Sequence, residues 1–153
     1  MMKSILVMNG PNLNLLGQRE PGLYGNTTLA DVETLCHDAA QKHGVAIEFM
    51  QSNHEGVLID AMHDAGRKIA NGDMIGVVFN AGAFTHTSVA LQDAIKGAQV
   101  PVIEIHISNV HAREEFRHHS YLSPVAAGIV VGFGVKGYAL AIDGLMATYG
   151  DEA

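Results

Sequence analysis

The sequence has little of several features that mark particular classes of protein. Cys36 is the one cysteine among 153 residues, so no disulfide forms within the chain. Because small secreted domains commonly depend on disulfides, we expect a reducing, cytoplasmic compartment. Cys36 falls on the apolar face of a predicted helix, which favours a core residue over a reactive thiol.

Positive charge is also scarce. Lys and Arg total 9 against 16 Asp and Glu, which gives a formal net charge of −7 at pH 7. Nucleic-acid binding needs a basic face, so we expect no nucleic-acid partner, although a local basic pocket for a small anion stays open. No run approaches the ~20 apolar residues of a membrane-spanning helix, and the first apolar run is too short for a secretory signal. We therefore expect no membrane partner.

What the sequence does contain indicates one folded domain over residues 1–153. Hydrophobic residues make up 48% and charged residues only 16%, a balance that argues against disorder. Short apolar runs predict strands at 4–8, 45–50, 74–79, 100–107 and 128–132. Most of these runs are continuous rather than alternating, as is typical of parallel strands covered on both faces. Between and after them, apolar periodicity with caps and glycine stops predicts helices within 28–44, 56–72, 87–97 and 138–150.

Five strands with intervening helices predict a doubly wound α/β domain. In so short a chain we expect a flavodoxin-like three-layer sandwich with a five-stranded parallel sheet in the order 2-1-3-4-5. Ligands of such folds bind beyond the carboxyl ends of the strands, near the point where the strand order reverses. The first, third and fourth strands are neighbours in this order, so the segments after them should line one pocket.

Those three segments are the richest in polar side chains. Loops are often polar because they are solvated, so each alone is weak evidence, but the three together favour an active site. The candidates are Asn12, Arg19 and Tyr24 after the first strand, Asn80 and His86 after the third, and Glu104, His106, Ser108, Arg113 and Arg117 within and after the fourth.

The fourth strand carries an unusual pair. Alternation places Glu104 and His106 on the same side of a strand that is otherwise apolar. A buried charge needs a partner, so one interpretation is a histidine acid oriented by the glutamate. The other interpretation is a buried pair that only satisfies itself.

The segment HAREEFRHHS, residues 111–120, follows this strand. Arg113 and Arg117 would share one face if the segment is helical, and they would then either clamp an anion or form solvated pairs with Glu114 and Glu115. His118 and His119 lack further ligands at suitable spacing, so we expect no metal site.

GFGVKG, residues 132–137, matches the glycine pattern of dinucleotide-binding loops. That fingerprint needs a further strand and an acidic residue about 20 positions later, and the sequence ends before this. Tight strand-to-helix packing is the better interpretation. A non-catalytic flavodoxin-like module that binds a nucleotide or flavin remains the alternative function.

The stretch from Met8 to Gly25 is several times longer than the usual two to six residues of a strand-to-helix loop. A free tyrosine has a pKa of about 10, and a nearby guanidinium lowers it. Arg19 and Tyr24 could therefore act together as a base in a loop that closes over a substrate. The alternative is a surface arginine and a packing tyrosine.

Five stretches together resemble one family, the type II 3-dehydroquinate dehydratases. They cover most of the chain, in order: NGPNLNLLGQREPGLYG, QSNHEGVLID, FNAGAFTHTSVALQDAI, EIHISNVHAREEFRHHSYLSPVA and GFGVKGYALA. The resemblance implies the flavodoxin-like fold and the anti elimination of water from 3-dehydroquinate through an enolate, with no cofactor and no metal. It implies a place in aromatic biosynthesis or quinate breakdown, and a homododecamer built as a tetramer of trimers. Phe84 and Gln92 depart from the family pattern at positions that concern subunit contacts.

The resemblance also implies roles for individual residues. Tyr24 resembles the base, Arg19 the group that sustains its phenolate, and His106 the acid, oriented by Glu104. Asn12 resembles the residue that holds a water against the enolate oxygen, and Arg113 a lid partner. Substrate binding would fall to Asn80, His86 and Arg117 with the backbone of Ile107 and Ser108, and Asp93 would reach a neighbouring subunit's site. A lysine Schiff base is the other route to the same product, with Lys136 as the one lysine near the expected site.

Overall fold

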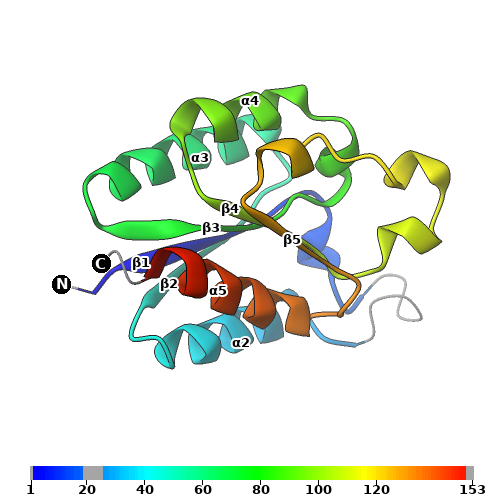
Figure 1. The fold of residues 1–153 in the computed structure, drawn as a ribbon. Helices are drawn as coiled ribbons and strands as arrows, with labels where there is room; N and C mark the ends of the chain where they lie inside the picture. Colours follow the sequence, from blue (N-terminus) through cyan, green and yellow to red (C-terminus); the bar gives the residue numbers. More distant parts are fainter. Residues whose placement is uncertain (1, 19–25, 151–153) are drawn as a thin grey trace.

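The computed structural model describes residues 2–18 and 26–150. Its centre is a five-stranded parallel sheet in the order β2-β1-β3-β4-β5 (Figure 1). The strands are β1 Ser4–Asn9, β2 Ala46–Gln51, β3 Met74–Asn80, β4 Val102–His106 and β5 Gly128–Val131. The α-helices within the described residues are α2 Leu29–Gln41, α3 Glu55–Ala70, α4 Val89–Ala98 and α5 Lys136–Tyr149. The predicted fold and strand order are confirmed.

Two hydrophobic cores lie on the two faces of the sheet. Helices α2 and α5 cover one face, and α3 and α4 cover the other (Figure 1). Ile5 and Val7 of β1 belong to the first core, whereas Leu6 and Met8 belong to the second. Because successive side chains of a strand point to opposite faces, a sheet covered on both sides needs the continuous apolar runs seen in the sequence.

Helix α2 begins at the capping residues that the sequence predicts. Thr28 caps α2 with a complete capping box, in which its hydroxyl accepts from the Asp31 N–H and the Asp31 carboxylate accepts from the Thr28 N–H. Cys36 is fully buried in the first core, as predicted. Burial and the nearby Glu33 raise the pKa of the Cys36 thiol to about 12, so the thiol stays protonated.

The glycine-rich segment before α5 brings helix and strand together. A Cβ on Gly137 would lie 3.1 Å from Cδ1 of Ile105 and 3.4 Å from Cγ1 of Val130. Gly132 and Gly134 have φ angles of +94° and +65°, which most side chains disfavour. The structure therefore supports the interpretation of GFGVKG as a packing segment.

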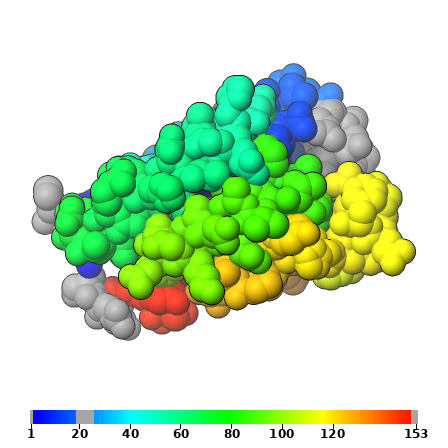
Figure 2. Space-filling model, turned by 90° about the horizontal axis from the view of Figure 1, so that it is seen from above, coloured from blue at the N-terminus to red at the C-terminus, as the bar shows by residue number. Residues whose placement is uncertain are grey.

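The segments after β1, β3 and β4 meet at the carboxyl edge of the sheet. They contain short 3₁₀ turns: η1 Leu13–Leu15, η2 Gly82–His86, η3 Val110–Ala112, η4 Glu115–Arg117 and η5 Ser123–Val125. Seen from the side of α3 and α4, residues 110–120 project at one end of the molecule (Figure 2). No helix in the described part of the chain is long and apolar enough to cross a membrane.

Candidate active site

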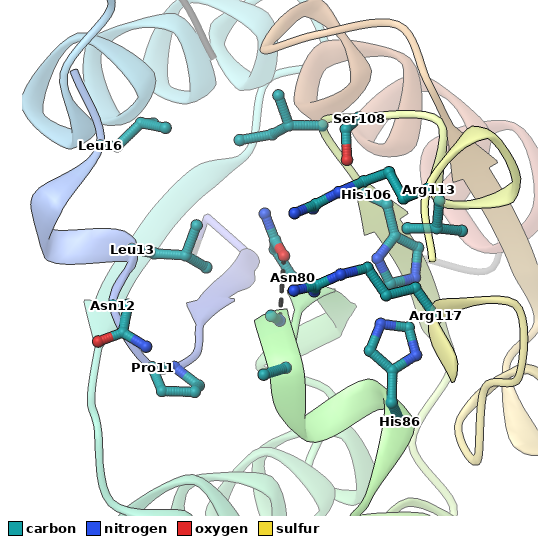
Figure 3. Close-up of a pocket in the computed structure, with 14 residues that line it drawn as sticks. Pro11, Asn12, Leu13, Leu16, Asn80, His86, His106, Ser108, Arg113 and Arg117 are labelled. Atoms are coloured by element: carbon teal, nitrogen blue, oxygen red, sulfur yellow. Dashed lines mark hydrogen bonds between the residues drawn. The ribbon is translucent and has the colours of Figure 1, made fainter. Parts of the chain in front are cut away.

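A pocket of about 200 Å³ opens where these three segments meet (Figure 3). One side of the pocket is formed by Arg113, Arg117, His86 and His106. The other side is formed by Asn12 and Leu13. The lining residues are Pro11, Asn12, Leu13, Leu16, Asn80, Gly82, Ala83, His86, His106, Ile107, Ser108, Val110, Arg113 and Arg117. The site therefore lies at the switch point of the strand order, as the fold predicts.

Asn80 ends β3 and is held from behind by a buried network. Its Nδ2 donates to the Tyr138 hydroxyl over 2.9 Å, and that hydroxyl donates to Oδ1 of Asn9 over 2.6 Å. Its Oδ1 accepts from the Gly82 N–H over 3.2 Å. Burial raises the pKa of Tyr138, so the phenol remains a neutral donor and acceptor. These bonds fix the orientation of the Asn80 amide at the pocket wall.

Asn12 has a left-handed backbone, with a φ of +68°. Its N–H donates to Oδ1 of Asn53 over 3.0 Å, and the same oxygen accepts from Nε2 of Gln51. Gln51 Nε2 also donates to the Gly10 carbonyl. The end of β2 and the segment after it thus support Asn12, and asparagine is among the residues that best tolerate this conformation.

Glu104 and His106 form a buried pair. His106 Nε2 lies 2.5 Å from Glu104 Oε2, and the exposed fractions of the two residues are 7% and 1%. Burial opposes ionisation of Glu104, but hydrogen bonds from His106, Ser123 and Ser120 outweigh it and lower the pKa of the carboxyl group. Glu104 is therefore a carboxylate at neutral pH, and it orients a histidine that lines the pocket.

Arg113 and Arg117 both line the pocket, but they are not on one helix. The described structure of the segment is two short 3₁₀ turns, η3 and η4, so the condition of a shared helical face is not met. The predicted pairing with an acidic neighbour is partly present: Arg117 Nε lies 3.4 Å from Glu114, and Arg113 Nε lies 3.9 Å from it. The two guanidinium groups therefore place positive charge at the pocket wall of an otherwise acidic protein.

His86 completes this wall. Its Nδ1–H donates to the His119 carbonyl over 2.8 Å, and its ring stacks with that of His106 at a centroid distance of 6.4 Å. Burial lowers the pKa of His86, the bond to His119 opposes this, and His106 and Arg117 lower it further. The neutral imidazole can then hydrogen-bond a hydroxyl of a ligand with Nε2.

The matched family model is described as dehydroquinase class II, and it covers residues 3–146. The chain belongs to this family. Relatives called 3-dehydroquinate dehydratase are 72% identical in Variovorax paradoxus and 70% identical in a Marinomonas species. Each match covers 95% of this chain and 99% or 97% of the relative. The crystal structure of a type II dehydroquinase from Butyrivibrio crossotus is similar with a TM-score of 0.88 at 46% identity, covering 94% of this chain and 97% of that one.

Most of the predicted site residues come together in the described structure. Those that line the pocket are Asn12, Asn80, His86, His106, Ile107, Ser108, Arg113 and Arg117. Glu104 lies behind His106 and is hydrogen-bonded to it. Arg19 and Tyr24 lie outside the described residues, and their roles stay predictions.

Asp93 is the predicted site residue that lies elsewhere. It is exposed on α4 and lines a separate surface hollow with Gln92 and Lys96. Its predicted role concerns a neighbouring subunit's site and stays a prediction. Within the described part of the chain, no three His, Cys, Asp or Glu residues are grouped to hold a metal ion.

The sequence did not point to the side chains behind the pocket. Tyr138 fits the apolar stripe of a helix, and its hydroxyl contacts residues 58 and 129 positions away. Ser120 and Ser123, which donate to Glu104, lie in a segment with no periodicity. The available signal is the buried carboxylate itself, because it demands donors from somewhere in the fold.

Proposed function

We propose that the chain removes water from 3-dehydroquinate to give 3-dehydroshikimate, with Tyr24 as base, His106 as acid and no covalent intermediate. The family and the names of the relatives support the reaction. The observation that carries the mechanism is the Glu104–His106 pair facing a pocket lined by Arg113 and Arg117. A proton donor beside paired cations suits a substrate that carries a carboxylate and must lose a hydroxyl group.

The first step is proton abstraction. The Tyr24 phenolate, sustained by the Arg19 guanidinium, takes a proton from the carbon next to the ketone, and the electron pair moves to the ketone oxygen to form an enolate. A water held by Asn12 hydrogen-bonds this oxygen. Asn12 lies at the pocket wall with a fixed left-handed backbone, which supports this role.

The second step is loss of the hydroxyl group. The enolate electron pair returns to form the carbon–carbon double bond, the carbon–oxygen bond breaks on the face opposite the removed proton, and His106 gives its proton to the departing oxygen. The leaving group is then water, and the neutral His106 stays hydrogen-bonded to Glu104. Solvent exchange returns the proton from Tyr24 and restores the one lost by His106.

Binding falls to the groups around this centre. Asn80 and His86 hydrogen-bond substrate hydroxyls, Arg117 pairs with the carboxylate, and the Ile107 and Ser108 backbone assists. All five line the pocket. Arg113 acts as a lid partner, and Asp93 of one subunit reaches the site of its neighbour in a dodecamer made of four trimers.

The position of the lysines favours this route over a Schiff base. All five lysines lie in the described part of the chain, and none of them is among the residues that line the pocket. Lys136 begins α5 and is exposed. Borohydride added together with 3-dehydroquinate should therefore leave the activity intact, whereas substrate-dependent inactivation would favour the lysine.

The assignment of the base is tested by two variants. Tyr24→Phe and Arg19→Ala should each lower kcat by at least ~10²-fold, the usual scale for positioned acid–base groups. Substrate binding, measured by calorimetry, should largely survive. A Tyr24→Phe protein with near wild-type turnover would end the assignment.

A further inference from the structure

The Glu104 carboxylate lies in surroundings that do not favour a charge. In register beside it are Phe79 on β3 and Ile129 on β5, neither of which can donate a side-chain hydrogen bond. In the described part of the chain, His106 is hydrogen-bonded to Glu104, and His86 interacts electrostatically with His106, Glu104 and Arg117. A carboxylate that is 1% exposed is costly unless all its acceptor sites are used.

The remaining donors come from two serines on the segment that returns to β5. Ser120 Oγ donates to Glu104 Oε2 over 2.9 Å, and Ser123 Oγ donates to Oε1 over 2.7 Å. They lie 16 and 19 residues beyond Glu104, and they follow Arg113 and Arg117 in the chain. Neither serine is among the residues that line the pocket.

The two serines do not have the same task. Oε2 receives bonds from both His106 and Ser120, whereas in the described part of the chain Ser123 is the donor to Oε1. Ser120 Oγ also accepts from the N–H groups of Leu122 and Ser123, so it shapes the turn as well. The bond to Oε1 of Glu104 is therefore the main interaction of the Ser123 hydroxyl in the described structure.

We propose that Ser123, with Ser120, is a positioning residue for the dehydration: the two hydroxyls hold Glu104 as an oriented carboxylate, which in turn fixes the ring of His106. Because Glu104 takes the Nε2–H, Nδ1 is the ring nitrogen left to carry the transferable proton. A carboxyl group without the Ser123 bond can rotate or take a proton, and His106 then loses its fixed orientation. This proposal rests on the proposed function.

The test is the pH profile of kcat in Ser123→Ala, with 3-dehydroquinate as substrate. Loss of a donor to the charged form makes Glu104 easier to protonate, so the acid limb should move to higher pH. We expect kcat on the acid side to fall about 10-fold, with a smaller loss at the plateau and KM changed less than about 2-fold. Ser123→Thr, which keeps the hydroxyl, should restore the profile.

Two further variants separate positioning from stability. Ser88→Ala removes the hydroxyl of a buried serine, which accepts from the Leu91 N–H at the start of α4, and it should leave the profile unchanged. Ser123→Cys keeps a weak donor and should give a smaller shift in the same direction, which provides the test if Ser123→Ala does not fold.

Superimposable profiles for wild type and Ser123→Ala, or for Ser123→Cys where it is used instead, would overturn the proposal. So would a loss that is equal at every pH and matched by Ser88→Ala. If the wild type itself has no turnover, the dehydration fails, and a role of the serines in it fails for that separate reason.

Discussion

At the scale of residues, the pocket depends on polar side chains that lie behind it. Asn80 is held by Tyr138, which is itself bonded to Asn9, and Glu104 is held by Ser120 and Ser123. None of these four supporting residues is among those that line the pocket. A hydrogen bond of this kind contributes only a little to the net free energy of folding, but a buried group that loses its partner is strongly destabilising. Small changes behind the wall should therefore have measurable effects.

Tyr138→Phe is the first such change. Loss of the hydroxyl leaves Oδ1 of Asn9 and one Nδ2 hydrogen of Asn80 without a partner, which should lower the free energy of unfolding by about 1–3 kcal/mol. The freed Asn80 amide should also raise KM. Urea denaturation and steady-state kinetics measure the two effects. Tyr149→Phe on the same helix is the matched control, because the described residues give its hydroxyl no hydrogen bond; equal effects of the two variants would contradict this account.

The lowered pKa of Glu104 makes a prediction about stability and pH. The unfolded chain binds a proton at this group at a higher pH than the folded chain does, so its stabilising contribution is complete above the unfolded pKa of about 4.3 and is lost as pH falls through the folded pKa. The difference in Tm between wild type and Glu104→Gln should therefore shrink on acidification from pH 6 to pH 3. A difference that is constant over this range would show that the charge of Glu104 contributes nothing.

Some residues of the site could be predicted from the sequence and others could not. The two-residue alternation in β4 was enough to predict the Glu104–His106 pair, because strand geometry is regular. The burial of the pair is compatible with both interpretations: a catalytic histidine oriented by the glutamate, and a structural pair whose members only satisfy each other's hydrogen bonds. The serine donors could not be predicted, because they reach Glu104 through a long irregular segment.

At the scale of elements, the periodic spacing of apolar residues made the strands and helices predictable. The 3₁₀ turns have no such pattern, so the sequence did not predict them. All five predicted strands and all four predicted helices are present, with bounds that differ by at most three residues. Between β4 and β5, the chain follows tertiary contacts instead, such as the Tyr121 N–H to the Thr85 carbonyl at 2.9 Å. No local pattern in HAREEFRHHS encodes such contacts, and the segment forms 3₁₀ turns rather than the helix that would place Arg113 and Arg117 on one face.

The junction of β1 and β3 gives a prediction at this scale. A Cβ on Gly10 would lie 2.3 Å from the Ala81 carbonyl oxygen, and the Gly10 N–H donates to the Asn80 carbonyl. Gly10→Ala should push apart the two segments that bear Asn12 and Asn80. We expect a loss of about 1–3 kcal/mol in the free energy of unfolding, measured in urea, together with lower activity.

Gly56→Ala is the matched control for this variant. Gly56 lies in α3, and a Cβ added to it would meet nothing within 4 Å beyond the backbone of its own helix, so alanine should leave stability unchanged or raise it slightly. A Gly10→Ala protein as stable as Gly56→Ala would contradict the close approach of the two strands' ends.

At the scale of the whole molecule, the property to be measured is the number of subunits in the assembly. The resemblance to type II dehydroquinases implies twelve subunits, and Asp93, exposed on α4, is the residue expected to reach a neighbour's site. Light scattering coupled to gel filtration should give a mass near twelve times 16.3 kDa. A stable monomer with full activity would refute both the dodecamer and the role of Asp93 across subunits.

The dehydration can be observed directly as ultraviolet absorbance after 3-dehydroquinate is added to the purified, chelator-treated protein. The product is a conjugated enone and the substrate is not, so elimination of water appears as rising absorbance. If the chain dehydrates 3-dehydroquinate without a metal or a Schiff base, the absorbance should rise, and the rise should survive both chelator and borohydride. A folded, assembled protein that gives no rise would contradict the proposed dehydration, and nucleotide binding to the same pocket would be the next function to test.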